Sequence, residues 1–191
     1  MSAILFSFII LFTSAPYPVT LNIGFQTTKP QGPPPPAALP QAQVGNGKVN
    51  VHYWPDENYT SVNLLNLDVW GADNDRVSMG VQFSVQGKKV FAPKAVSMHF
   101  VSVSNKRRFG DKAKLVAYAG EKEMKFNQSR QLPATSDGGM VLEWVEFIVP
   151  FSSFNEMTQA DPVRLKVGEF DFTLSKEALE SLRDVNRAVA H

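Results

Sequence analysis

Apolar and polar positions alternate most regularly near the C-terminus of this chain. Six apolar residues stand at alternate positions within two short runs there: Val163, Leu165, Val167, Phe170, Phe172 and Leu174. Gly168 and Glu169 join the runs, and glycine in the first loop position suits a type II′ hairpin turn. A two-residue loop pairs Val167 with Phe170, so all six side chains share one face. The pattern predicts a β-hairpin with one buried face.

A helical pattern follows the hairpin at once, over residues 175–189. Ser175 suits the N-cap position, and Leu174 and Leu179 have the spacing of a hydrophobic staple. One apolar stripe runs along the helix: Ala178, Leu182, Val185 and Val189. We expect this stripe to pack on the sheet; a helix that binds a partner protein is the alternative.

Period-two alternation recurs through residues 77–86, and shorter strands are expected at 89–92, 115–119 and 124–126. Two runs change phase, between Leu64 and Leu65 and between Phe100 and Val101, which predicts β-bulges. Residues 140–149 are apolar on both faces, which predicts a central strand covered on both sides.

These elements predict an all-β fold with about eight or nine strands, at spacings typical of sandwiches. We expect an immunoglobulin-like or related antiparallel β-sandwich over residues 46–191. A short helix is expected near 151–160, and the C-terminal helix at 175–189.

The C-terminal pattern resembles that of uncharacterised bacterial exported all-β proteins, which end in a hairpin of the form VxLxxG followed by ExxFxL and in an LxxLR helix. The resemblance is carried by Phe151, Phe154, Val163, Leu165, Gly168, Phe170, Phe172, Leu174, Leu179, Leu182 and Arg183. It covers only the last part of the chain, from about residue 151, and consists of core positions. It implies the fold and a bacterial origin, and it transfers no activity.

The N-terminus has a different composition. Residues 3–12 form an apolar run as long as the core of a signal peptide, and small residues follow at 13–15. Pro16 and Pro18 end the run before the roughly 20 apolar residues of a membrane span. We expect residues 1–15 to be a cleaved export signal. An uncleaved anchor and an apolar strand of a cytoplasmic domain are the alternatives.

Residues 16–45 are rich in proline, with six of the 13 prolines between Pro30 and Pro40. Proline fixes φ and removes a backbone donor, so this stretch favours an extended polyproline II spacer. A ligand for an aromatic groove in another protein is the alternative.

Charge and cysteine content exclude several classes of function. Lys29 is the only charged side chain before residue 46, so the expected domain contains 18 basic and 18 acidic residues. Such a neutral domain has no overall field to attract nucleic acid or an anionic membrane. The chain has no cysteine, which excludes disulfides, thiolate metal sites and cysteine nucleophiles. Any membrane contact would pass through an uncleaved N-terminus.

Aromatic residues cluster near residue 54, where Tyr53, Trp54 and Tyr59 surround acidic positions. Exposed rings stack on the apolar faces of sugars and carboxylates accept hydroxyl hydrogens, so these three residues are the candidate ligand-binding set. The alternative is that Tyr53 and Trp70 belong to the core and Trp54 packs at a strand end. A sugar site would leave Trp54 and a second ring coplanar and exposed.

Acidic and basic loops offer weaker candidates. Asp73 and Asp75, two positions apart, suit a calcium ion, with Asp56, Glu57 and Asp68 to complete the shell; an ordinary turn competes with this interpretation. Residues 106–108 form the only basic cluster, which we expect to be a solvated loop.

No catalytic motif, zinc-ligand spacing or cofactor motif occurs in the sequence. Glu143 and Glu146 are three apart on a strand, so they point to opposite faces and do not form a catalytic pair. The sequence therefore favours a non-catalytic exported protein with a structural or binding role at the cell envelope. A carbohydrate- or protein-recognition module is the alternative. A hydrolase comes third, and it would need His52 or His99 beside a serine or carboxylate.

Overall fold

The computed structural model describes residues 47–189, and the expected signal and linker (1–15 and 16–45) lie outside them. Two antiparallel sheets make up most of the structure, as the sequence predicts. The strands are β1 (Val49–Trp54), β2 (Tyr59–Ala72), β3 (Asp75–Gln86), β4 (Ala95–Ser104), β5 (Leu115–Ala119), β6 (Lys122–Phe126), β7 (Ser129–Gln131), β8 (Thr135–Asp137), β9 (Met140–Pro150), β10 (Val163–Val167) and β11 (Phe170–Thr173). The helices are α1 (Phe151–Gln159) and α2 (Lys176–Arg187).

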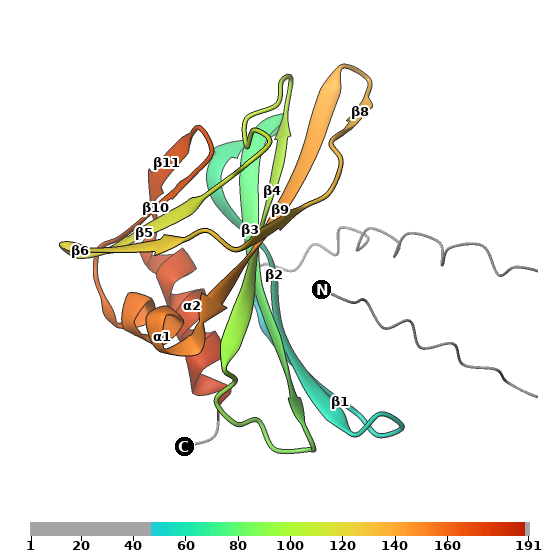
Figure 1. Cartoon of the computed structure of the whole chain (residues 1–191), viewed down its shortest axis with the longest axis vertical. Coiled ribbons are helices and arrows are strands. Elements are labelled where there is room, and N and C mark those ends of the chain that lie inside the picture. The colour runs from blue at the N-terminus through green and yellow to red at the C-terminus, as the bar shows by residue number, and fades with distance from the viewer. Residues whose placement is uncertain (1–46, 190–191) are drawn as a thin grey trace, which may run out of the picture. The chain divides into compact units, whose positions relative to one another are not determined.

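The larger sheet has the order β1-β2-β3-β4-β9-β7, with β8 also paired to β9, and the smaller one has the order β11-β10-β5-β6. The smaller sheet and both helices lie on the same side of the larger sheet (Figure 1). Helix α2 packs on β2, and α1 contacts β4, β5 and β9. The sandwich is therefore asymmetric, because its second layer is part sheet and part helix. The face of the larger sheet turned away from this layer is called the outer face below.

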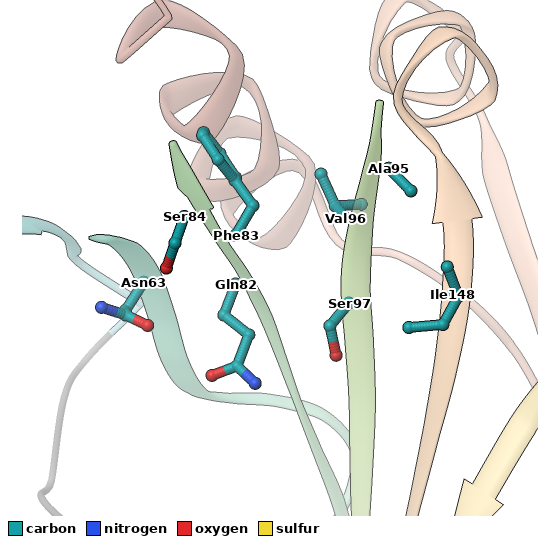
Figure 2. A pocket seen from close by; sticks show the side chains of 8 residues that line it. All are labelled: Asn63, Gln82, Phe83, Ser84, Ala95, Val96, Ser97 and Ile148. Atoms are coloured by element: carbon teal, nitrogen blue, oxygen red, sulfur yellow. The ribbon is translucent and has the colours of Figure 1, made fainter. Parts of the chain in front are cut away.

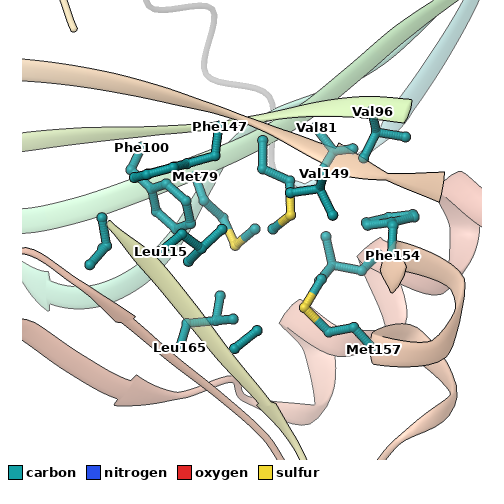
Figure 3. Close-up of a cluster of buried hydrophobic side chains, with 14 of the residues drawn as sticks. Met79, Val81, Val96, Phe100, Leu115, Phe147, Val149, Phe154, Met157 and Leu165 are labelled. Carbon is teal, nitrogen blue, oxygen red and sulfur yellow. The ribbon is translucent and has the colours of Figure 1, made fainter. Parts of the chain in front are cut away.

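The core lies between the two layers (Figure 3). Phe100 and Phe147 of the larger sheet meet edge to face, with ring centroids 6.0 Å apart. Leu165 of the smaller sheet and Phe154 and Met157 of α1 fill the opposite side, and all three are fully buried. Each large ring that is buried removes roughly 150–250 Å² from water.

The C-terminal hairpin and helix form as the sequence predicts. Val167 pairs with Phe170 across a turn in which Gly168 has φ +58°. A Cβ at Gly168 would lie 2.5 Å from the carbonyl oxygen of Arg108, so the position needs glycine for space as well as for conformation. The hydroxyl of Ser175 accepts the backbone N–H of Ala178 at 3.1 Å and caps α2.

One predicted bulge is present and the other is absent. The register between β2 and β3 shifts between Leu64 and Leu67, as the phase change predicts. The pairing of β4 with β3 and with β9 is continuous, so the bulge expected after Phe100 is wrong. Ser102 and Ser104 take the inner positions instead, and Val101 and Val103 point outward. Ser104 is tolerated inside because its hydroxyl donates to the carbonyl of Lys106 in the adjoining loop, whereas the buried Ser102 hydroxyl has no hydrogen-bond partner within residues 47–189.

Two further strand predictions are corrected. Only one face of β9 is covered by the second layer, and Ile148 on the other face is 38% exposed. The apolar residues on the outward face of β9 had led to the prediction of a strand covered on both sides, which is wrong. Residues 89–92 form no strand, and Phe91 is 56% exposed in the connection to β4. The eleven strands within residues 47–189 exceed the predicted number chiefly through β7 and β8, whose three residues each carry no apolar alternation.

Candidate functional site

The outer face of the larger sheet carries a row of side chains that crosses five strands. It is polar on the first four strands and ends at an apolar residue on β9, and it is called the polar row below. Its members are Asn50, Asn63, Gln82, Ser97 and Ile148, each paired in register with the next. Alternation along each strand places them opposite the core residues, because successive side chains point to opposite faces. Figure 2 shows the amides, the hydroxyl and Ile148 side by side, while Phe83 and Val96 turn toward the helices.

A shallow cavity of about 360 Å³ opens along this row. Its lining includes the small side chains Ser84, Ala95 and Ser97 and the longer amides Asn63 and Gln82. Each amide offers two donors and one acceptor oxygen, and each serine offers one donor and an acceptor. The cavity therefore suits a ligand that carries many hydroxyl groups.

An aromatic pair lies on the same face at the tip of the β1–β2 hairpin. Trp54 and Tyr59 are directly opposite in register, with ring centroids 6.1 Å apart and planes 26° from parallel. Trp54 is 45% exposed, Tyr59 is half-buried, and the indole N–H donates to the Ser61 hydroxyl at 3.2 Å. The imidazole of His52 meets the indole edge to face at 4.4 Å. The two ring planes are near parallel and the rings stack on each other, so this pair is not the coplanar, exposed platform expected of a sugar site, and the partly exposed Trp54 ring is the surface on which a sugar could stack.

The third predicted aromatic, Tyr53, does not join this pair. It precedes Trp54 on the strand and therefore faces the other side, where its hydroxyl donates to Asn58 Oδ1 at 3.0 Å. Trp70 belongs to the interior side as well, with its ring 5.0 Å from that of Phe170. The candidate set thus keeps Trp54 and Tyr59 and loses Tyr53.

A stacked cluster occupies the next part of the outer face. The Arg130 guanidinium lies 5.4 Å from the centroid of the Trp144 ring, and His99 stacks near the same indole at 6.4 Å and 19°. Glu146 is opposite both His99 and Arg130 in register, and its carboxylate lies 3.6 Å from Arg130 Nε. The Ser97 hydroxyl donates to the other oxygen of Glu146, which connects this cluster to the polar row.

His99 is buried although it lies on the outer face, with only 8% of its surface exposed. Gly80, its partner on β3, makes this burial achievable: a Cβ there would lie 2.2 Å from His99 Nε2. Burial lowers the pKa of His99, because desolvation disfavours the imidazolium, and the nearby Glu146 carboxylate opposes the effect in part. His99 is therefore neutral at physiological pH.

A hydrolase would need a histidine beside a serine or carboxylate, and His99 meets this requirement only in part. Glu146 lies beside His99, but Ser97 donates to Glu146, and no hydrogen bond within residues 47–189 joins His99 to either. Glu143 lies on the inner face and Glu146 on the outer one, so the two point to opposite faces as predicted. The Glu143 carboxylate accepts the backbone N–H groups of Arg108 and Phe109. That carboxylate fixes a loop, so the two glutamates do not flank a common substrate.

The acidic candidates for calcium are dispersed. Asp73 adopts φ +49° in the β2–β3 turn, and Asp75 receives a hydrogen bond from Arg108 at 2.6 Å. Asp56 and Glu57 lie at the opposite end of β2, roughly 40 Å away at about 3.3 Å per residue. No group of three or more acidic or histidine residues in the described part of the chain is placed to hold a metal ion.

The basic loop is neutralised by its neighbours. Lys106 pairs with Glu169 at 3.2 Å and Arg107 with Asp111 at 2.9 Å. Arg108 lies 5.4 Å from the rings of both Trp70 and Phe170 and is only 18% exposed. The loop therefore offers little unpaired positive charge to a phosphate.

Sequence reasoning identified the aromatic pair but missed the polar row and the Arg130–Trp144–His99 stack. The polar alternation of residues 78–86 was a signal for the row, whereas the stack joins β4, β7 and β9, which are distant in sequence.

No family model, curated protein or solved structure matches this chain. Within residues 47–189, no helix has the length and apolar content that crossing a bilayer requires.

Proposed function

We propose that this protein is a non-catalytic, exported bacterial binding protein of the cell envelope, and that its outer face recognises carbohydrate. The observation that carries the proposal is the partly exposed Trp54 ring, stacked on Tyr59, on the same face as the polar row. Export and bacterial origin rest on the apolar segment at residues 3–12 and on the C-terminal resemblance.

Ring stacking and hydrogen bonding would act on different parts of one ligand. The aromatic pair lies four positions along β2 from Asn63, a separation of about 13 Å. An extended glycan would stack one sugar unit on Trp54 and place the hydroxyls of a later unit over the amides of Asn63 and Gln82. The open, shallow cavity leaves much of such a ligand hydrated, so we expect affinities near 1 mM, about −4 kcal/mol.

Affinity electrophoresis through gels that contain soluble bacterial polysaccharides tests the proposal, with a glycan array to extend the panel. We expect at least one polysaccharide to retard the full chain. Trp54→Ala should weaken that retardation about fivefold or more, the loss of roughly 1 kcal/mol of stacking. Phe91→Ala removes a ring elsewhere that is at least as exposed as Trp54, and it should leave the retardation unchanged.

Gln82→Ala separates the two contributions, because it removes hydrogen bonds and leaves the aromatic pair intact. We expect it to weaken binding as well. Failure of every polysaccharide to retard the protein would refute carbohydrate recognition, and so would equal retardation of the parent and Trp54→Ala.

A further inference from the structure

Strand β1 forms one end of the larger sheet, and within residues 47–189 nothing pairs with its outer edge. Its sequence, Val-Asn-Val-His-Tyr-Trp, contains no lysine, arginine, acid, proline or glycine. Its register with β2 is continuous over six pairs, so no bulge turns the edge away. Natural edge strands are protected by such devices, and an uncharged strand of high β-propensity without them readily accepts another strand.

The inner side of β1 is only partly covered by the second layer of helices and the smaller sheet. Val51 is 48% exposed, whereas its cross-strand partner Val62 is fully buried. Both side chains point to the same face, the one that the helices and the smaller sheet cover further along. Figure 1 shows the β1–β2 hairpin projecting away from that second layer. An apolar side chain at an unpaired edge gains free energy when a further strand is added beside it.

We propose that β1 of a second copy of this chain pairs antiparallel with β1, with Val51 opposite Val51 of the second copy. The fourteen strands of the two seven-stranded larger sheets would then form one continuous sheet. This interface is independent of the carbohydrate proposal, because it uses the edge and inner side of β1 rather than the outer face.

Geometry fixes the allowed registers. A two-fold axis that relates two antiparallel edge strands in one sheet stands perpendicular to it, so the inner faces of both copies lie on the same side. Residues opposite each other then belong to the same face. Pairing centred on Val51 places Val49 opposite Tyr53, so all three inner-face residues of the strand meet across the axis. Asn50 lies opposite His52 on the outer side.

A second copy fits this edge better than a charged partner does. Neither strand brings a formal charge to the ladder, so two identical edges meet without like-charge repulsion. The ladder is only about five residues long, and it falls in the class of small interfaces below roughly 1,200 Å². We therefore expect a weak dimer whose population rises with protein concentration.

Disulfide trapping tests the register, because the chain has no cysteine of its own. Directly opposite residues have Cβ atoms about 4.5–5.5 Å apart, close to the separation that a disulfide needs. In the full chain, Val51→Cys should form a covalent dimer under mild oxidation. Leu132→Cys, at a site of similar exposure far from β1, and Asn50→Cys, which faces His52 in this register, serve as controls.

We expect Val51→Cys to cross-link about tenfold faster than both controls, because pairing raises the effective thiol concentration toward the millimolar range. Sedimentation velocity of the parent chain should show a concentration-dependent dimer, and Val51→Lys should abolish it while Leu132→Lys does not. Cross-linking of Val51→Cys no faster than Leu132→Cys would overturn the proposal. That outcome would mean that the edge is covered by another occupant, such as residues 1–46, or left unpaired.

Discussion

Gly80 gives the sharpest test of how the outer face is built, through the substitution Gly80→Ala. Its backbone conformation is ordinary for a strand, so alanine introduces a Cβ without conformational strain. That Cβ would lie 2.2 Å from His99 Nε2, 2.4 Å from His99 Cε1 and 2.7 Å from the carbonyl oxygen of Leu64. Each separation is about 1 Å or more below an ordinary non-bonded contact of 3.5–4.0 Å. The imidazole must leave its place, and β2 must shift slightly.

The loss of stability in Gly80→Ala follows from the displacement of the imidazole and the shift of β2. Overpacking of a buried site typically costs about 1–3 kcal/mol. For a domain of this size, each kcal/mol lowers Tm by roughly 2–4 °C, so we expect a decrease of about 2–12 °C. Much of the destabilisation by Gly80→Ala should depend on the presence of the His99 imidazole. The double variant Gly80→Ala with His99→Ala should then be more stable than the sum of the single effects predicts, by about 0.5–2 kcal/mol.

Urea unfolding followed by tryptophan fluorescence measures all four corners of this cycle, since Trp144 stacks near His99. Ser84→Ala, an exposed change on the outer face of β3, serves as the control and should stay within about 0.5 kcal/mol of the parent. Additive single effects, or an unchanged stability of Gly80→Ala, would refute the close packing of His99 against β3.

Other measurements test further parts of the structure. Because burial lowers the folded-state pKa of His99 below its ordinary value of 6.5, the unfolded chain binds that proton first, so stability should fall as pH decreases below about 6.5, with a slope limited to about 1.4 kcal/mol per pH unit. His99→Gln should remove this slope between pH 6.5 and 5, a window above the carboxylate titrations, and an unchanged slope would contradict the assignment. Leu165→Ala should cost about 2–5 kcal/mol in urea unfolding, because Leu165 is fully buried between the layers. Ser175→Ala should cost about 1 kcal/mol, because it leaves the Ala178 N–H without its cap, and a value near zero would count against that hydrogen bond. Mass spectrometry of the protein from its native host should find an N-terminus near residue 16 in an envelope or extracellular fraction, and an intact Met1 in the cytoplasm would contradict export.

Local sequence patterns were sufficient to predict those elements whose defining contacts join residues close together in the chain. The hairpin at residues 163–173 and the cap at Ser175 depend on residues a few positions apart, so period-two alternation and helical spacing predicted both. The same rule failed after Phe100, where a change in apolar phase was taken for a bulge. There Ser102 and Ser104 stay inside, one of them bonded to a loop carbonyl, and the register does not change.

Trp54 and Tyr59 could be chosen as a site from the sequence because a short turn joins their strands. Tyr53 was grouped with them by proximity in the chain, although alternation along β1 places it on the opposite face. The alternation of residues 78–86 indicated a polar face on one strand, but the sequence could not assemble the Asn63–Gln82–Ser97 row or the His99 stack. Both join strands whose order in the sheet the sequence does not state.

The sequence alone determined that extended segments with one apolar face must bury it together, and that a capped helix closes the chain. This follows because side-chain alternation and helix capping are properties of a few consecutive residues. Tertiary structure alone decided which face of the larger sheet stays uncovered, which strand forms its edge, and which polar side chains meet there. Those outcomes depend on pairing between segments tens of residues apart, where the free energy of packing selects one arrangement among many that share the same local pattern.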